Sequence, residues 1–351
     1  MQTHSGVGGL VVIMHVRRAV VVAVVGGALW GGFAPQVHAA PADMGPGQSR
    51  QPGKVVFWDD DDQTTEFVPA EVRSGVTAVA AAAGGFRSSP AAVALRRGKV
   101  IAWHFSPVPV PKEARSGVTA IAGGFSTLMA VKAGQVIIWD AESGRVVPVP
   151  AEARSGVSAI AGGEEHYLAL KGGAVIAWGS NAHGQTDVPE EAQSGVTAIA
   201  AGQYYSLALK AGEVIAWGSN SEGQISVPPE ARSGVTAIAA GNSHALALKA
   251  GRVIAWGQNF DGQTSIPASV RSGVTSIAAG YNQSIALKAG RVIGWGWAYK
   301  KPRMSQGDAI SSARTIHYPR HESVVTVPAE ALSGVTAIAA ASNLALAIKG
   351  R

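Results

Sequence analysis

The stretch SGVTAIAAGQYYSLALKAGEVIAWGSNSEGQ, residues 194–224, contains the pattern that decides the fold. Residues 195–202 are typical of a strand that ends in glycine, residues 206–210 of a second strand and residues 213–217 of a third. An Ala-Gly pair separates the second strand from the third, and the loop after the third is rich in Gly, Ser and Asn, as turns require. The stretch therefore predicts a three-stranded meander.

This unit repeats along the chain. A Ser-Gly-Val motif has its glycine at Gly75, Gly117, Gly156, Gly195, Gly234, Gly273 and Gly334, and a tryptophan recurs at Trp58, Trp103, Trp139, Trp178, Trp217, Trp256 and Trp295. Four successive intervals between the glycines are 39 residues long. A meander cannot bury both faces alone, whereas stacked meanders bury them against one another. The repeats predict an all-β, seven-bladed β-propeller of short three-stranded blades.

The two ends of the repeat array complement each other. Residues 54–58 supply a lone third strand, and residues 334–349 supply a first and a second strand. Together they make one blade. We expect the N-terminal strand to pair beside the C-terminal ones, because this closes the ring and removes an open sheet edge.

The N-terminal residues have the features of an export signal. Arg17 and Arg18 precede an apolar stretch that runs to about Ala34, and small residues lead to a cleavage site after Ala39. This order is typical of a secretory signal peptide. We expect residues 1–39 to be removed and the mature protein to be secreted.

The rest of the chain divides into a lead-in and a propeller. Residues 40–53 are rich in Pro, Gly and Ser, which predicts a flexible lead-in. Residues 54–351 form the propeller, with an insertion at about 297–325 after the last tryptophan. Met14 is an alternative start, since residues 1–13 add nothing that an export signal needs. No later segment is long and apolar enough to span a membrane, so no membrane partner is expected.

Composition and motifs argue against enzyme activity and metal binding. The 351 residues include no cysteine, which excludes disulfides, thiol nucleophiles and cysteine-bound metals. The sequence has no nucleophile elbow, phosphate loop, dinucleotide fingerprint or zinc-protease motif. His166 and His244 share one repeat position with Tyr205 and Gln283, so they follow from the scaffold. We expect no enzyme activity, no cofactor and no metal.

The repeat resembles a known family. Gly-Val-Thr-Ala-Ile-Ala-Ala-Gly, Leu-Ala-Leu-Lys and Val-Ile-Ala-Trp-Gly-x-Asn-x-x-Gly-Gln resemble the RCC1-type propeller repeat. The short period, with Val-Pro-x-Glu-Ala-Arg-Ser-Gly between blades at residues 149–156, is most similar to the beta-lactamase inhibitory protein II family. That resemblance implies a secreted seven-bladed propeller that blocks class A β-lactamases.

Topology assigns the candidate binding residues to one face. The loops between the first and second strands and the loops after each tryptophan lie on the same side, the top face. Aromatic and acidic residues gather in these loops, as they do at protein interfaces. The candidates are Phe86, Phe105, Phe125, Glu165, Tyr204, Phe260, Asp261, Tyr281, Trp297 and Tyr299. Filling of the channel mouth by some of these rings is an alternative that the sequence leaves open.

The resemblance carries over to this face only in part. The family's inhibitors bind through aromatics in these loops, and Tyr204 and Phe260 match such positions. Other blades have Ser126, Glu165 and Ser243 where the first of these aromatics is expected, and the loops after Trp103 and Trp139 lack the Gly-Gln signature. These departures leave the target open.

The opposite, bottom face carries Lys and Arg at the blade turns. This ring either attracts an anionic polymer or is a solvated turn copied by duplication. No aromatics interleave with the charges, so we expect no nucleic-acid partner. We expect a monomer that inhibits a β-lactamase or a related penicillin-interacting enzyme by steric occlusion. A secreted adhesion or surface-binding module with another protein or cell-wall partner is the alternative.

Overall fold

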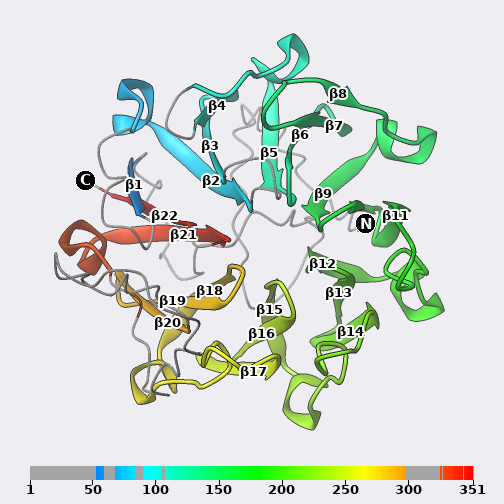
Figure 1. Ribbon diagram of the computed structural model, residues 1–351, viewed down its shortest axis with the longest axis vertical. Coiled ribbons are helices and arrows are strands. Elements are labelled where there is room, and N and C mark those ends of the chain that lie inside the picture. The colour runs from blue at the N-terminus through cyan, green and yellow to red at the C-terminus, as the bar shows by residue number, and fades with distance from the viewer. Residues whose placement is uncertain are drawn as a thin grey trace, which may run out of the picture.

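The computed structural model describes residues 53–58, 68–83, 90–103, 107–296, 325, 327–342 and 344–350. The predicted signal peptide and nearly all of the lead-in and the insertion lie outside these residues. The described part of the chain folds into strands and single-turn 3₁₀ helices. Figure 1 shows the sheets arranged in a ring around a central axis, as the repeat predicts.

Each blade has an inner, a middle and an outer strand. The inner strands are β2 (Val76–Ala82), β5 (Val118–Gly123), β9 (Val157–Gly162), β12 (Val196–Ala201), β15 (Val235–Ala240), β18 (Val274–Ala279) and β21 (Val335–Ala341). The middle strands are β3 (Ala91–Arg96), β6 (Thr127–Lys132), β10 (His166–Lys171), β13 (Tyr205–Lys210), β16 (His244–Lys249), β19 (Gln283–Lys288) and β22 (Leu344–Lys349). The outer strands are β4 (Lys99–Trp103), β7 (Gln135–Asp140), β11 (Ala174–Gly179), β14 (Glu213–Gly218), β17 (Arg252–Gly257), β20 (Arg291–Gly296) and β1 (Lys54–Trp58). The blades are called A to G in the order of these lists, so that blade A consists of β2, β3 and β4 and blade G of β21, β22 and β1.

Blade G joins the two ends of the described chain. β1 pairs antiparallel with β22, so that Lys54 lies opposite Lys349 and Trp58 opposite Ala345. β21 pairs with the other edge of β22 and contacts both β2 and β18. Blade G therefore lies between blades A and F, which confirms the predicted pairing of the terminal strands.

Blade B departs from the predicted three strands. A fourth strand, β8 (Val146–Val147), pairs with β7 at its outer edge. The turn before β8 forms because the Asp140 carboxylate accepts hydrogen bonds from the backbone N–H and the hydroxyl of Ser143, at 2.7 and 2.6 Å. The same bonds hold the pKa of Asp140 below its usual value. The local Asp-Ser turn, not the repeat, produces this strand.

The segments between blades contain single-turn 3₁₀ helices. They are η2 (Ala70–Arg73), η3 (Lys112–Ala114), η4 (Ala151–Arg154), η5 (Glu190–Gln193), η6 (Pro229–Ala231), η7 (Ala268–Val270) and η8 (Ala329–Leu332). A proline precedes each one, and its fixed φ prepares the turn. Among the described residues, no helix is long and apolar enough to cross a membrane.

The core lies between neighbouring blades. Trp217 of blade D, for example, shares a buried cluster with Leu168 and Leu170 of blade C and Ile199 of its own blade. The inner strands carry small alanines such as Ala159 in the same cluster. Small side chains let seven inner strands converge on the axis, while the wider gap near the rim holds the indoles. Stacking of blades thus supplies the apolar burial that one blade lacks.

Candidate functional site

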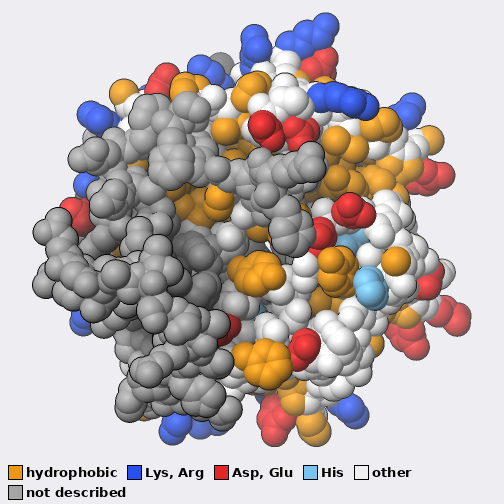
Figure 2. Space-filling model, in the orientation of Figure 1, with side chains coloured by type: hydrophobic (Ala, Val, Ile, Leu, Met, Phe, Trp, Pro, Cys, Tyr) orange, Lys and Arg blue, Asp and Glu red, His pale blue; other side chains and the backbone are white. Residues whose placement is uncertain are grey.

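Two sets of loops form the top face of the ring. The inner loops connect the inner and middle strands, and the outer loops follow the outer strands. Because neighbouring strands in each blade are antiparallel, both sets emerge at the same end. Figure 2 shows this face, where hydrophobic, acidic and histidine side chains lie close together over blades C to E.

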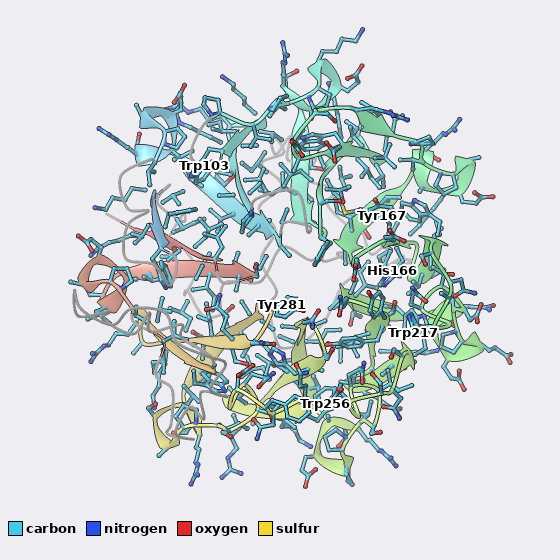
Figure 3. All side chains as sticks on the ribbon, in the orientation of Figure 1. Trp103, His166, Tyr167, Trp217, Trp256 and Tyr281 are labelled. Carbon is cyan, nitrogen blue, oxygen red and sulfur yellow. The ribbon has the colours of Figure 1, made fainter. Side chains whose placement is uncertain are left out.

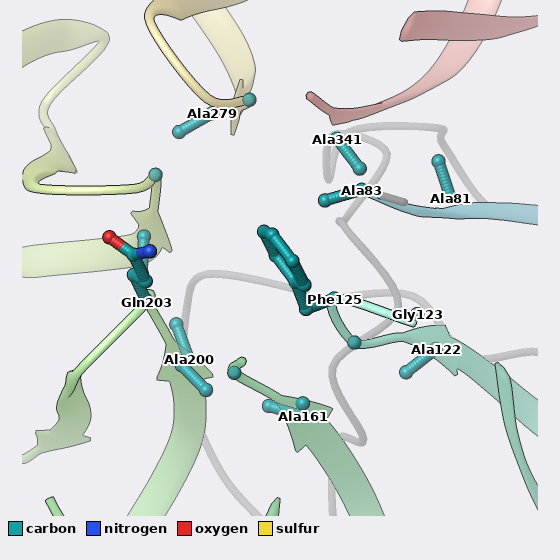
Figure 4. Close-up of a pocket in the computed structure, with 18 of the residues that line it drawn as sticks. Ala81, Ala83, Ala122, Gly123, Phe125, Ala161, Ala200, Gln203, Ala279 and Ala341 are labelled. Atoms are coloured by element: carbon teal, nitrogen blue, oxygen red, sulfur yellow. The ribbon is translucent and has the colours of Figure 1, made fainter. Parts of the chain in front are cut away.

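The first residues of the inner loops, a glycine and the residue after it in blades B to F, line the mouth of the central channel. A cavity of about 110 Å³ is bounded there by Phe125, Glu164, Gln203, Asn242, Tyr281 and Ser342. Figure 4 shows the Phe125 ring directed into this cavity, and Figure 3 places Tyr281 near the axis, with Trp217 and Trp256 nearer the rim. Phe125 and Tyr281 thus line the channel mouth, which is the alternative that the sequence left open for some of the rings. Tyr281 still exposes 37% of its surface.

Backbone hydrogen bonds link the inner loops from blade to blade. Phe125 N–H donates to the Gly163 carbonyl at 2.9 Å, and Tyr281 N–H donates to the Ser342 carbonyl at 2.9 Å. Equivalent bonds join Ala83 to Gly124, Glu164 to Gln203, Gln203 to Asn242 and Asn242 to Gly280. Among the described residues, six of the seven blade boundaries carry such a bond, so these bonds connect the inner loops around the channel mouth.

The outer loops of blades C, D and E share one internal bonding pattern. In blade E, the Asn259 side-chain oxygen accepts the Thr264 N–H at 3.0 Å, and its amide donates to Ser265 at 3.1 Å. The Gln263 side chain accepts the Asp261 N–H at 3.0 Å. Asn181 with Gln185 and Asn220 with Gln224 repeat the pattern. The Asn and Gln of the Gly-x-Asn-x-x-Gly-Gln signature therefore hold each loop in one shape.

A small cluster surrounds Tyr204. Its ring lies 4.6 Å from the ring of His183, and its hydroxyl hydrogen-bonds the Glu164 carboxylate. This bond, with smaller contributions from burial and from the charges of Glu164 and Glu165, raises the pKa of Tyr204 to about 12. Gln203 donates to the same Glu164 carboxylate. The cluster joins an inner loop of blade C, its outer loop and an inner loop of blade D.

Phe260 stands at the tip of the blade E outer loop. It exposes 78% of its surface, the highest value among the large hydrophobic residues that the structure describes as exposed. Asp261 follows it and is partly buried, which raises the pKa of its carboxyl. Because the loop is held by hydrogen bonds, its backbone need not be ordered when a partner covers the exposed ring, which favours a role as an interface anchor.

The structure divides the predicted residues into three groups. Phe125 and Tyr281 line the channel mouth, while Glu165, Tyr204, Phe260 and Asp261 lie on surrounding loops. The other four predicted positions, Phe86, Phe105, Trp297 and Tyr299, lie outside the described residues. The prediction did not include His183 and Gln203. Aligning the outer loops would have found His183, because it occupies the position held by Glu222 and Asp261 in the next two blades.

A buried Ser–His contact on this side of the ring is structural. His166 Nε2 lies 3.1 Å from Ser206 Oγ, and that hydroxyl donates to the Gln185 carbonyl at 2.8 Å. Ser206 and His166 are fully buried, so no substrate reaches the hydroxyl. His244 with Ser284 repeats the arrangement two blades later. The prediction that this repeat position serves the scaffold agrees with these bonds.

A glycine makes room for each of these histidines. A Cβ on Gly241 would lie only 2.2 Å from His244 Cε1. Burial lowers the pKa of both His166 and His244 to about 4. The described residues contain no group of three or more His, Cys, Asp or Glu that could hold a metal ion.

On the bottom face, the repeated lysines bond to the scaffold. Lys210 Nζ donates to the Glu191 carbonyl in η5 at 2.9 Å. The same contact recurs for Lys132, Lys171, Lys249, Lys288 and Lys349. The lysine at this position in six blades thus makes a structural contact that the repeat copies.

Comparison with protein families and solved structures gives the same architecture. The model of the regulator of chromosome condensation (RCC1) repeat matches residues 196–224 and 235–263, which are blades D and E with their outer loops. No curated protein sequence matches the chain significantly.

Solved structures resemble the whole ring at low sequence identity. Yeast RCC1 (Prp20), solved with Kap60, is 17% identical with a TM-score of 0.64, over 96% of this chain and 97% of its own. Prp20p from Saccharomyces cerevisiae, in a structure described with its binding to Gsp1p and histones, is 17% identical with a TM-score of 0.63, over 86% of this chain and 92% of its own. Human WBSCR16 is 17% identical with a TM-score of 0.53, over 78% of this chain and 87% of its own. Blades D and E thus match the RCC1 repeat, and the chain has the β-propeller fold of these solved structures.

Proposed function

We propose that this protein is secreted and non-enzymatic, and that its top face binds and occludes the active site of a class A β-lactamase. The observation that supports the binding role is the exposed Phe260 on the same face as the Tyr204 cluster, on an outer loop that internal hydrogen bonds hold in place. Ordered loops lose little entropy on binding, which favours tight complexes. The yeast protein of the same fold binds proteins, Gsp1p and histones among them.

The β-lactamase target rests on the sequence. The short period and the Val-Pro-x-Glu-Ala-Arg-Ser-Gly connector support it through their resemblance to the inhibitor family. Secretion rests on the signal-like residues 1–39. An extracellular propeller would meet a secreted β-lactamase in the same compartment. Occlusion needs no chemistry from the inhibitor, in keeping with the fully buried Ser206–His166 pair.

Hydrolysis of a chromogenic β-lactam tests this function. The chain from Ala40 onward is added to a panel of class A β-lactamases, and inhibition is measured for the wild type and for Y204A, F260A and L332A. Leu332 is a matched control, because it is an exposed hydrophobic residue on the bottom side in η8.

We expect nanomolar inhibition that Y204A and F260A each weaken by roughly 30-fold, the equivalent of about 2 kcal/mol for a central anchor. L332A should inhibit like the wild type. If no enzyme of the panel is inhibited at micromolar concentration, the β-lactamase target is wrong, and the adhesion or cell-wall alternative takes its place.

A further inference from the structure

Charge is unevenly distributed over the molecule. Seven top-face loops of blades C to F, here called the acidic sector, cover residues 163–165, 179–187, 202–204, 218–226, 241–243, 257–265 and 280–282. They contain five acids, Glu164, Glu165, Asp187, Glu222 and Asp261, and neither Lys nor Arg. The sector thus has a formal charge of −5, whereas the whole chain has +6. A basic protein with one acidic face has a field that favours a cationic partner there.

No Lys or Arg side chain that the structure describes forms an ion pair with these acids. Glu164 and Asp187 accept hydrogen bonds from the neutral amides of Gln203 and Asn181. The lysines of the repeat lie at the other end of the blades and donate to backbone carbonyls there. Within the described part of the chain, therefore, no cation offsets the sector's negative charge.

Aromatic rings lie among the acids. Phe260 is 78% exposed and precedes Asp261, while Tyr281 is 37% exposed at the channel mouth. Tyr204 lies against Glu164, and the charge of Glu165 acts on it as well. A ring face beside a carboxylate suits the guanidinium of arginine, which stacks on aromatics and pairs with carboxylates. The sector therefore offers an arginine side chain both a ring to stack on and a carboxylate to pair with.

We propose that the acidic sector receives a protruding, arginine- or lysine-bearing segment of a protein partner, with Tyr204, Glu164 and Glu165 at its centre. This inference rests on the proposed role of the top face in protein binding and adds the chemistry of the partner. Aromatic exposure favours a protein segment over a free cation, because the rings gain from burial by an apolar stem.

Backbone amide shifts of the ¹⁵N-labelled chain from Ala40 onward test the proposal. The probe is hexa-arginine with blocked ends, and hexa-glutamate is its opposite. One variant, E164Q/E165Q/E222Q/D261N, removes four sector charges. A matched control, E113Q/E152Q/E230Q/E330Q, removes four charges from exposed acids of the bottom-side 3₁₀ turns. Thermal unfolding verifies that both variants fold.

We expect hexa-arginine to shift amides of the sector, with its dissociation constant about tenfold higher in the sector variant and within twofold of wild type in the control. Raising NaCl from about 50 to about 300 mM should also weaken binding, since salt screens exposed charges. If the Glu164 change disturbs the loops, E165Q/E222Q leaves the Gln203 bond intact and should still weaken binding severalfold.

Other results would overturn the proposal. These are equal weakening by both variants, shifts outside the sector, or equal binding of hexa-glutamate. Self-association at low salt, seen by sedimentation and lost in the sector variant, would replace the partner with a second copy. The β-lactamase assay separates the two proposals. If the sector variant inhibits the β-lactamase as strongly as the wild type does, this inference is wrong and the β-lactamase target stands. If hexa-arginine binds the sector but no β-lactamase is inhibited, the β-lactamase target is wrong and this inference stands.

Discussion

The indole Nε1 of Trp217 donates a hydrogen bond of 3.0 Å to the backbone carbonyl of Gln185, across the boundary between blades D and C. Trp256 and Trp295 make the same bond, at 2.9 Å, to Gln224 and Gln263. The glutamine of each outer loop thus shapes its own loop with its side chain and binds the next blade with its carbonyl. This couples the top-face loops to the core.

Replacing Trp217 by Phe should therefore cost more stability than replacing Trp139 by Phe. Both indoles are buried, but the Nε1 of Trp139 has no hydrogen-bond partner among the described residues. W217F loses a hydrogen bond worth about 1 kcal/mol, whereas W139F removes a donor with no partner in the described part of the chain. We expect the free energy of unfolding of W217F to be lower by at least about 1 kcal/mol, as measured by urea unfolding. Equal losses would show that the bond contributes nothing.

The buried histidines should make the protein sensitive to acid. The pKa of His166 and His244 is about 4 in the folded chain, below the usual 6.5, because burial disfavours the charged ring. Between these values the unfolded chain binds more protons, so stability is full above about pH 6.5 and falls as pH drops toward 4. Each histidine should cost up to about 3 kcal/mol by pH 4. Urea unfolding at pH 7.5, 5.5 and 4.5 measures this.

A glutamine variant provides the control for that acid sensitivity. Blade F holds Gln283 at the position of His244, so H244Q suits the repeat. The loss of stability between pH 6.5 and 4 should shrink by about half in H244Q. Asp140, whose pKa is lowered from 3.8, loses its contribution only at still lower pH. An unchanged pH profile in H244Q would refute the assignment.

The sequence predicts the ring because its signals repeat. The Ser-Gly-Val and Trp columns set the blade count, and the complementary ends set the pairing of β1 with β22. The bonds between blades are harder to predict, since they join residues such as Trp217 and Gln185 that no local pattern connects. One such difference can be read from the sequence. The loop after Trp139 lacks the Gly-Gln pair, and the Nε1 of the next tryptophan, Trp178, has no hydrogen-bond partner among the described residues.

The candidate binding residues also divide into a part that the sequence predicts and a part that needs the structure. Tyr204 and Phe260 were predicted because exposed aromatics in loops are rare and conspicuous. Whether a ring faces the channel or the solvent depends on its place in the loop. The residue after the first glycine of the inner loop, as in Phe125 and Tyr281, lines the channel mouth, and the next residue, as in Tyr204, is not part of that lining. Only the bonds between neighbouring loops fix that geometry.

The repeated lysine should act on stability. In K210M the bond from Lys210 Nζ to the Glu191 carbonyl is lost, while the aliphatic stem over Gly195 is kept. We expect a loss of about 0.5–1 kcal/mol, because the bond is exposed to solvent. K99M is the control, since Lys99 is an exposed strand end on the same face. Thermal unfolding measures both variants. Equal losses of stability in K210M and K99M would mean that the bond from Lys210 contributes nothing to stability.

The Tyr204 cluster can be observed directly by titration. The hydrogen bond to Glu164 raises the pKa of Tyr204 to about 12, above the usual 10, because ionising the phenol would break the bond and place two negative charges together. In E164Q the charge is gone, so the pKa should move back toward 10. NMR of ¹³C-labelled tyrosine rings follows Tyr204 through the pH series, and Y204F identifies its signal. A Tyr204 pKa that is the same in wild type and E164Q would mean that the hydroxyl does not bond to Glu164, and the centre of the acidic sector would then have to be drawn around other residues.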